Sequence, residues 1–547
     1  MLKRTSRMML LGMTAALAAS GCSSNSDSQN SSSASPSGGN PSAASSASAS
    51  TQSDASTPIE LTMMGPKQSI QGPWEDMDFF KEMEKRTNIH FKFDTPPITS
   101  YQEKKNLAFA SGDLPDVLFA AQLTPSEEVN YGKQGLIVPL EDLIERHAPN
   151  IKKLLDDNPA VRKSITTTDG HIYALPQVTE LAHNLINKTW INGAWMKNVG
   201  ADQAPKTTEE LYALLKAFKE KDANQNGKND EIPLSGINID SIRPFILSAF
   251  GYLSNYSVLS NQLDVVQVID DKVVYVPTTE GYKQYLIYMN KLYKEQLLDN
   301  EIFSQTSEQF TAKGKENRIG VFPSAAPFLV LDIKTDEENF QNPVLPALTS
   351  AFNATPTYLL NNGTSRGTFA ITKKDKYPER TIAWIDYLYT QEGGILANSG
   401  VEGKGWKWVD AEKTKWERLA VDGKNIEESR AMNAPDPGLV IPTFKGKDFH
   451  YKINNPVTQW LHKTSEPFLA IAKTPYPLVY FSDDEQKRMN VLTTDLTTYV
   501  SQSEAKFILS KDVEAGWDEY VKTIENMNVN ELLSIYQAAY DRWNQSK

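Results

Sequence analysis

Side chains that carry oxygen recur at alternate positions of one short segment, DANQNGKNDE at residues 222–231. This spacing is that of an EF-hand-like calcium loop, in which hard oxygen ligands surround one point and a glycine at position 6 allows a sharp turn. Gly227 stands at that position. The candidate metal ligands are the residues at positions 1, 3, 5, 7, 9 and 10, namely Asp222, Asn224, Asn226, Lys228 (through its backbone carbonyl), Asp230 and Glu231.

The segment departs from the EF-hand pattern at position 12, where Pro233 replaces the usual bidentate glutamate. Glu231, at position 10, is expected to take this role. The alternative interpretation is a solvated polar loop, since asparagine and glycine are also ordinary turn residues. We predict a structural Ca²⁺ ion, because the loop's own ligands would saturate the ion and leave little room for substrate chemistry.

Three tryptophans next to glycine-rich segments could contact a ligand, because an aromatic ring offers a flat apolar face. Trp74 follows a Gly/Pro-rich loop at the end of a predicted strand, and its alternative role is packing at the start of a helix. Trp406 and Trp408 follow Gly403 and Gly405. These three tryptophans are predicted to bind ligand, although most aromatic residues of any globular protein are simply core.

The sequence offers little support for an enzyme. None of the motifs GxGxxG, GxxxxGK[ST], GxSxG and HExxH occurs. One SxxK tetrapeptide, Ser503 to Lys506, lacks the SDN and KTG motifs that accompany it in acyl-transfer enzymes. The chain has 68 Asp and Glu residues, and two of them could form the carboxylate pair that glycoside hydrolysis requires. A surface glycan hydrolase is therefore kept as an alternative.

Composition narrows the class of protein further. A formal net charge of −12 argues against a nucleic-acid partner, since a phosphate backbone requires a basic surface. The six histidines form no HxxxH-type pair, so a catalytic zinc site has no local support. The single cysteine, Cys22, excludes an intramolecular disulfide framework and any site built from several thiolates.

The N-terminal segment has the pattern of a secretion signal. A basic start is followed by an apolar stretch and then by Ala19-Ser20-Gly21-Cys22, which resembles a bacterial lipobox. We predict a signal peptide over residues 1–21, lipidation of Cys22 and a disordered, Ser-rich tether over 22–57. An ordinary signal peptide with a chance cysteine is the alternative. The lipid would then be the only attachment to the membrane, because no later stretch has 18 consecutive apolar residues.

The positions of these groups depend on the elements that carry them. Alternating apolar residues predict strands over 59–63 and 89–93, and helical spacing predicts helices over 74–87 and 101–110, before a buried strand that ends at Phe119. This order indicates βαβ units and a largely parallel sheet. A further helix, opened by a capping box of Thr207 and Glu210, leads directly into the loop at 222–231.

Several stretches resemble one family. The segments ASGDLPDVLF (110–119), GLIVPLEDLIERHAPN (135–150) and GTFAITKKDKYPERTIAWIDYLYTQEGG (367–394) are similar to those of ABC-transporter extracellular solute-binding proteins of family 1. The resemblance covers essentially all of 58–547 and is strongest to the large Gram-positive lipoprotein branch and to alginate-oligosaccharide-binding proteins. It implies an α/β, periplasmic-binding-protein-like fold with two discontinuous α/β lobes around an interlobe ligand cleft.

The resemblance also implies domain limits and further ligand residues. Lobe one is expected at 58–180 plus 350–403, and lobe two at 181–349 plus 404–547. Glu180 occupies the position of a sugar-contacting carboxylate of maltose-type relatives, and Gln122, just past the third strand, is a candidate of the same kind. An exposed hinge residue is the alternative role for Glu180.

The function that the resemblance implies is oligosaccharide capture for an ABC importer. The protein would be a lipid-anchored monomer on the extracellular face of a bacterial, Gram-positive cell membrane, and it would dock on the transmembrane subunits of a permease. Peptide capture for an ABC transporter is a further alternative.

Overall fold

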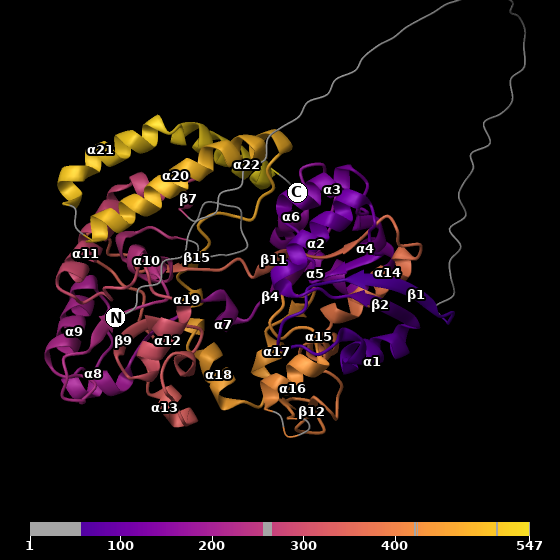
Figure 1. Cartoon of the computed structure of the whole chain (residues 1–547), viewed down its shortest axis with the longest axis horizontal. Coiled ribbons are helices and arrows are strands. Elements are labelled where there is room, and N and C mark those ends of the chain that lie inside the picture. Colours follow the sequence, from indigo (N-terminus) through magenta and orange to yellow (C-terminus); the bar gives the residue numbers. More distant parts are fainter. Residues whose placement is uncertain (1–55, 255–264, 421–422, 424, 510–511, 546–547) are drawn as a thin grey trace, which may run out of the picture. The chain divides into compact units, whose positions relative to one another are not determined.

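The computed structural model describes residues 56–254, 265–420, 423, 425–509 and 512–545. The predicted signal peptide, the lipidation of Cys22 and nearly all of the predicted tether lie outside these residues. Within the described ranges, no helix is both long and apolar enough to cross a lipid bilayer. Two α/β lobes, each with a sheet and a core of its own, are formed by segments that alternate along the chain (Figure 1).

Lobe one contains a six-stranded sheet. Its strands, in spatial order, are β14 (Phe444–Lys445), β4 (Leu175–Thr179), β11 (Thr364–Ile371), β3 (Val117–Phe119), β1 (Ile59–Met64) and β2 (Ile89–Asp94). β1 is parallel to β2 and β3, and β14 is parallel to β4, whereas β11 is antiparallel to both β3 and β4. Five strands therefore share one direction, and their carboxyl ends lie at one edge of the sheet.

Helices pack against this sheet through apolar faces that the sequence pattern indicates. Phe79, Phe80 and Met83 of α1 are buried beside Ile59 and Leu61, which alternate with exposed residues along β1. The helices of this lobe are α1 (Asp78–Thr87), α2 (Ile98–Ser111), α3 (Pro125–Lys133), α4 (Glu141–His147), α5 (Pro149–Asp157), α6 (Pro159–Ile165), α14 (Pro378–Asp386), α15 (Gln391–Ser399) and α16 (Ile426–Asn433).

The first helix begins later than its periodicity predicts. The chain forms a 3₁₀ turn over Trp74–Asp76, and Met77 then adopts an extended conformation before α1 starts at Asp78. Pro378 stands at the first turn of α14, a position that suits proline because it has no N–H to leave unpaired there.

Lobe two has a smaller sheet of β5 (Thr189–Ile191), β9 (Ile319–Pro323) and β6 (Ile232–Leu234), and a hairpin of β7 (Val266–Ile269) and β8 (Lys272–Tyr275). β6 is parallel to β9 and β5 is antiparallel to it. The helices before the last crossing are α8 (Gly193–Val199), α9 (Thr208–Glu220), α10 (Ile239–Leu247), α11 (Glu280–Lys294), α12 (Ser307–Lys315) and α13 (Asp336–Phe340).

Three long C-terminal helices complete lobe two: α20 (Asp483–Leu509), α21 (Val513–Asn526) and α22 (Val529–Gln545), drawn in yellow in Figure 1. Apolar residues from all three join the core of α9, α10 and α11. Between α21 and α22, Asn528 adopts a left-handed conformation with φ 62°. Asparagine tolerates this region better than most residues, so the chain turns there.

Short elements lie where the chain passes between the two sheets. α7 (Ala182–Leu185) separates β4 of lobe one from β5 of lobe two. On a later passage β10 (Tyr358–Leu359) pairs in parallel with β15 (Ala472–Lys473), which follows α18 (Pro456–Lys463) and α19 (Glu466–Leu469).

One expected domain assignment is wrong. Residues 425–445, expected in lobe two, lie with the sheet of lobe one, because β14 hydrogen-bonds to β4 and because Leu439 and Ile441 are in that lobe's core. The hairpin of β12 (Trp406–Trp408) and β13 (Trp416–Arg418) packs with α17 (Asp448–Tyr451) and α15 in a small cluster of its own. The remaining lobe boundaries stay a prediction.

Candidate functional site

Two of the predicted ligand residues follow parallel strands at the same edge of the lobe-one sheet. Gln122 comes just after β3 and Glu180 directly after β4, with β11 between the two strands. Both residues are half-buried, and no hydrogen bond of either side chain is found among the described residues. Ligands of α/β sheets bind outside the carboxyl ends of the strands, so both side chains are available where a ligand is expected.

The backbone around Gln122 is held in an unusual conformation. Ala120 and Gln122 have φ values of 51° and 48°, which non-glycine residues rarely adopt. Two buried side chains bind the carbonyls of this segment, because Tyr101 donates to Ala121 O at 3.0 Å and Lys105 donates to Gln122 O at 2.8 Å. Strained backbone that its surroundings fix in this way is typical of binding sites.

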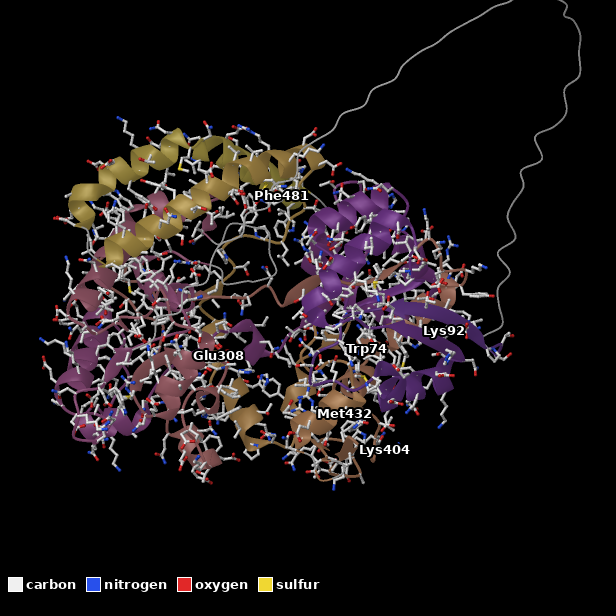
Figure 2. The ribbon with its side chains drawn as sticks, viewed as in Figure 1. Trp74, Lys92, Glu308, Lys404, Met432 and Phe481 are labelled. Carbon is white, nitrogen blue, oxygen red and sulfur yellow. The ribbon has the colours of Figure 1, made fainter. Side chains whose placement is uncertain are left out.

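Trp74 does not lie at a ligand-accessible surface, which contradicts the sequence prediction. Its exposure is 0%, and Figure 2 shows it in the interior of lobe one. Its ring stacks on Phe80 at 5.2 Å and meets the rings of Phe93 and Phe119 edge-on. The alternative role, packing at the start of a helix, describes its position: it opens the 3₁₀ turn before α1.

Trp406 is likewise a packing residue. It is 4% exposed, its indole N–H donates to Gly400 O at 2.9 Å, and its ring packs edge-on against Trp408 and Trp416. No face is therefore free for a sugar, and the prediction for Trp406 is wrong. Trp408 is partly exposed beside the Lys413 ammonium, 5.6 Å from its ring centre, and its ligand role stays a prediction.

A cavity of about 390 Å³ lies at the carboxyl ends of β6 and β9 in lobe two. Pro323 ends β9 opposite Thr189, the first residue of β5, and the loop after β6 forms another part of the wall. Polar side chains of the wall include His183, Asn184, Asn187, Lys188, Ser241 and Ser324, and Phe245 and Tyr358 supply aromatic surface. Sugar sites combine these two kinds of group.

Sequence reasoning missed this cavity. Its wall comes from four stretches that are far apart in the chain, residues 183–189, 237–245, 323–325 and 358–359, and no motif links them. The one signal available was a mostly polar stretch, HNLINKT at 183–189, which follows the predicted lobe boundary at 180/181. A cavity of this size and composition can enclose a small ligand or one unit of a larger one.

A buried basic cluster adjoins the cavity. Lys188 is 2% exposed, and its ammonium bonds His183 Nδ1 and Ser465 Oγ, both at 2.7 Å, and Leu461 O at 3.3 Å. Burial lowers the pKa of Lys188 to about 7. Burial and the Lys188 charge also lower the pKa of His183 to about 3 and that of His462 to about 4, so both imidazoles are neutral at physiological pH.

The predicted metal loop joins α9 to β6. Thr207 caps α9 by accepting from the Glu210 N–H, while the Glu210 carboxylate reaches one residue further back than a capping box requires, to the N–H of Lys206 at 2.7 Å. The loop itself contains positive φ values at Asp222 (45°) and Gly227 (74°). The turn that the EF-hand spacing predicts at Gly227 is therefore present.

Side chains of the loop converge on one point. The Asp222 carboxylate accepts from the backbone N–H groups of Asn226 and Gly227 at 3.1 Å, and the amide groups of Asn224 and Asn226 both donate to Asp230 Oδ1 at 2.9 Å. Burial alone would raise the pKa of Asp230, but these two amides and the nearby Arg318 charge outweigh it and lower the pKa.

The donor set fits a hard cation. Glu231 Oε1 is buried without a hydrogen-bond partner, and a carboxylate oxygen in that state can bind a metal ion. Rotation of the Asn224 and Asn226 amides would replace their nitrogens by oxygens around the same point. Within the described residues no group of three or more His, Cys, Asp or Glu side chains is placed to hold a metal ion, and this includes Asp222, Asp230 and Glu231.

Comparison with known proteins places this geometry in a family. Bacterial extracellular solute-binding proteins match residues 66–395, more than half of the chain. The fructooligosaccharide ABC transporter substrate-binding protein FusA of Streptococcus pneumoniae is 28% identical over 489 residues, covering 85% of this chain and 87% of FusA. Lipoprotein LipO of Bacillus subtilis is 23% identical and covers 88% of this chain and 92% of LipO.

Solved structures of the same relative agree with the fold. FusA in complex with kestose superimposes with a TM-score of 0.74 at 27% identity, covering 89% of this chain and all of the FusA chain. A FusA EF-hand mutant in complex with fructo-nystose gives a TM-score of 0.72 at 26% identity with the same coverage. The chain therefore belongs to the bacterial extracellular solute-binding proteins, a family of binding proteins for ABC transporters and not of enzymes.

Proposed function

We propose that this chain captures an oligosaccharide and delivers it to an ABC importer. The observation that carries the proposal is the cavity of lobe two, whose wall combines hydrogen-bonding side chains with the aromatic surface of Phe245 and Tyr358. Glu180 and Gln122 supply further hydroxyl partners at the corresponding edge of lobe one. The similarity to FusA over most of both chains supports an oligosaccharide as the ligand.

We propose further that the loop 222–231 binds a structural Ca²⁺ ion. Asp222, Asn224, Asn226 and Asp230 would supply side-chain oxygens, and Lys228 would supply its backbone carbonyl. Glu231, at position 10, would supply the carboxylate that Pro233 does not provide at position 12. The convergence on Asp230 and the unpartnered Glu231 oxygen support the proposal. The solved structure of a FusA EF-hand mutant indicates that this relative has an EF-hand, which also supports the proposal.

Anchoring and assembly complete the proposed function. Lipidation of Cys22 would hold the protein at the extracellular face of the cell membrane, with residues 22–57 as the tether. The match to an extracellular family and to the lipoprotein LipO supports this location. The protein would act as a monomer that docks on the transmembrane subunits of a permease.

The test is a ligand screen on the folded body, residues 56–547, with calcium present. Thermal-shift measurements would compare kestose and nystose with oligomers of alginate and polygalacturonan and with short peptides, followed by calorimetry. We expect one oligosaccharide class to raise the melting temperature and to be recovered intact. Binding of peptides alone would contradict the proposal, and a cleaved oligosaccharide would support the hydrolase alternative.

A further inference from the structure

The hydrogen bonds of Lys188 constrain the histidine beside it. Ser465 Oγ donates to Leu461 O at 2.8 Å, so this hydroxyl accepts its hydrogen bond from Lys188, and Leu461 O can only accept. The remaining partner of the lysine is His183 Nδ1 at 2.7 Å. An ammonium group has three N–H donors and no lone pair, so Nδ1 of His183 accepts when Lys188 is charged.

The tautomer of His183 follows from this contact. A neutral imidazole carries one proton, and if Nδ1 accepts, that proton is on Nε2. No partner for Nε2 is found in the described part of the chain, and Nε2 is not among the buried polar atoms that lack a partner. Because His183 lines the cavity of lobe two, its Nε2–H is available to a molecule in that cavity.

The titratable neighbours of His183 in the described part of the chain are basic groups. The groups that face His183 are Lys188, which precedes β5, and His462 of α18, whose Nδ1 accepts the backbone N–H of His183 at 3.4 Å. Lys188 also lies over the ring of Trp190, 5.7 Å from its centre. The hydrogen-bond partners of Lys188 among the described residues are His183, Leu461 O and Ser465 Oγ, so the imidazole is its one titratable partner there.

We propose that His183 contacts the ligand as a hydrogen-bond donor through Nε2, and that Lys188 is the positioning residue that fixes this tautomer. The proposal rests on the proposed function, since the ligand oxygen that accepts the bond would be a sugar hydroxyl or ring oxygen. The lysine therefore acts on the ligand through the histidine and not by direct contact.

Nitrogen-15 NMR of the histidine side chains tests the tautomer without any ligand. At pH 6 the spectrum of the folded body should show His183 neutral, with an unprotonated Nδ1 and a protonated Nε2. In Lys188→Met both tautomers should appear and His183 should become protonated at higher pH, because the lysine charge no longer opposes it. A protonated Nδ1 in the wild-type protein at pH 6 would overturn the proposal, whatever ligand the protein binds.

Calorimetry at pH 6 with the oligosaccharide identified in the screen tests the contact. His183→Phe should weaken binding about 5- to 100-fold, whereas His183→Gln, whose amide can still donate, should restore part of the loss. In the Lys188→Met background the loss caused by His183→Phe should shrink. His90→Phe, on the exposed face of β2 in lobe one, is the control and should bind as wild type does.

The outcomes separate the two proposals. If no oligosaccharide binds the wild-type protein, the proposed function fails, while the NMR result still decides the tautomer. If the oligosaccharide binds but His183→Phe binds equally well, the proposed function stands and the ligand contact is overturned. If His183→Phe weakens binding by the same factor with and without Lys188, the positioning role is overturned.

Discussion

Glu180 presents a carboxylate with no hydrogen-bond partner in the described part of the chain, at the end of β4 where a ligand of this fold is expected. Its backbone N–H, by contrast, is fixed to Lys445 O at 2.9 Å. The Glu180 carboxylate can therefore accept hydrogen bonds from two sugar hydroxyls. We predict that Glu180→Ala weakens oligosaccharide binding by about 1–3 kcal/mol and leaves the melting temperature of the ligand-free protein unchanged.

Calorimetry and thermal unfolding measure these two effects separately. Glu103→Ala is a matched control, because Glu103 is an exposed carboxylate in the middle of α2. Equal affinity of Glu180→Ala and wild type would assign Glu180 the alternative role of an exposed hinge residue.

Trp406 has a different role from the one that its sequence position indicates. Its ring is enclosed by Trp408 and Trp416, and its N–H is satisfied by Gly400 O. Trp406→Ala should therefore lower the free energy of unfolding by about 3–5 kcal/mol, the usual cost of removing a buried tryptophan. Trp408→Ala, at the partly exposed end of the same strand, should cost less.

Urea denaturation of both variants measures these costs. The interpretation would be contradicted if Trp406→Ala unfolded like the wild-type protein but lost its affinity for the oligosaccharide. That result would support the original prediction that Trp406 contacts the ligand.

The residue-scale predictions that failed share a physical reason. Trp74 and Trp406 both follow glycine-rich stretches. Such a position is compatible with the rim of a ligand site, but it carries no information on whether the side chain is buried. Their burial depends on residues distant in the sequence, such as Phe119 for Trp74 and Trp416 for Trp406. Trp384, by contrast, lies on the apolar face of a helix with Ile385, a local pattern that indicates a core position, and it is 1% exposed.

Among the elements, the loop between α9 and β6 offers the sharpest test. A ligand that binds only the folded state stabilises it by RT ln(1 + [L]/Kd), about 2.7 kcal/mol at 100 times Kd. Chelation should therefore lower the melting temperature, and added calcium should restore it. Asp222→Ala should abolish the response, because it removes the ligand at position 1.

Glu220→Ala is the control for the loop. It removes an exposed carboxylate two residues before Asp222 and should keep the full calcium response. Calcium-free protein by elemental analysis, together with a melting temperature that chelators do not change, would identify the segment as a solvated polar loop.

A second element-scale prediction concerns α3 and the segment that leads into α20. Glu128 of α3 is fully buried and accepts from the Tyr480 hydroxyl at 2.7 Å, while its other oxygen has no partner. Burial raises the pKa of Glu128 from 4.5 to about 7, against the opposing effects of the Arg366 charge and the Tyr480 hydrogen bond. The folded protein therefore keeps this carboxyl protonated at a pH at which the unfolded chain is already ionised.

The sign of the pH dependence follows. The protonated Glu128 carboxyl contributes its full stabilisation of the folded protein below pH 4.5, and this contribution is lost as the pH rises through about 7. The rise in pKa corresponds to about 3 kcal/mol in the free energy of unfolding. Glu128→Gln should thus unfold at a higher urea concentration than wild type at pH 8 and lose this advantage at pH 5. Glu103→Gln, on an exposed surface, should show no such difference, and parallel curves for Glu128→Gln and wild type would contradict the prediction.

Elements whose pattern is local were predictable, and long-range pairings were not. The alternation over 59–63 and 89–93 predicts β1 and β2, which pair in parallel as the βαβ order indicates. β14 contains two residues without any alternation, and its pairing with β4 joins Phe444 to Val178, 266 positions earlier in the chain (444 − 178). The domain assignment of 425–445 failed for this reason.

At the scale of the whole molecule, the groups available to a ligand are divided between two sheets. Glu180 and Gln122 lie at the carboxyl edge of the lobe-one sheet, and the cavity with His183 lies at the carboxyl edge of the lobe-two sheet. The sequence alone predicted the two lobes through the family resemblance, but not the cavity, because its wall forms only when four distant stretches meet.

An oligosaccharide that pairs with both edges must hold the two lobes in one arrangement, since each unpaired hydroxyl or buried donor would cost affinity. We predict that saturating amounts of the cognate oligosaccharide reduce the radius of gyration measured by small-angle X-ray scattering, as in hinge closure around a ligand. The double variant Glu180→Ala/His183→Phe, at the same sugar concentration, should keep the dimensions of the ligand-free protein. Scattering curves that do not change while calorimetry shows full occupancy would mean that one lobe binds the sugar alone, and Glu180→Ala should then leave the affinity unaltered.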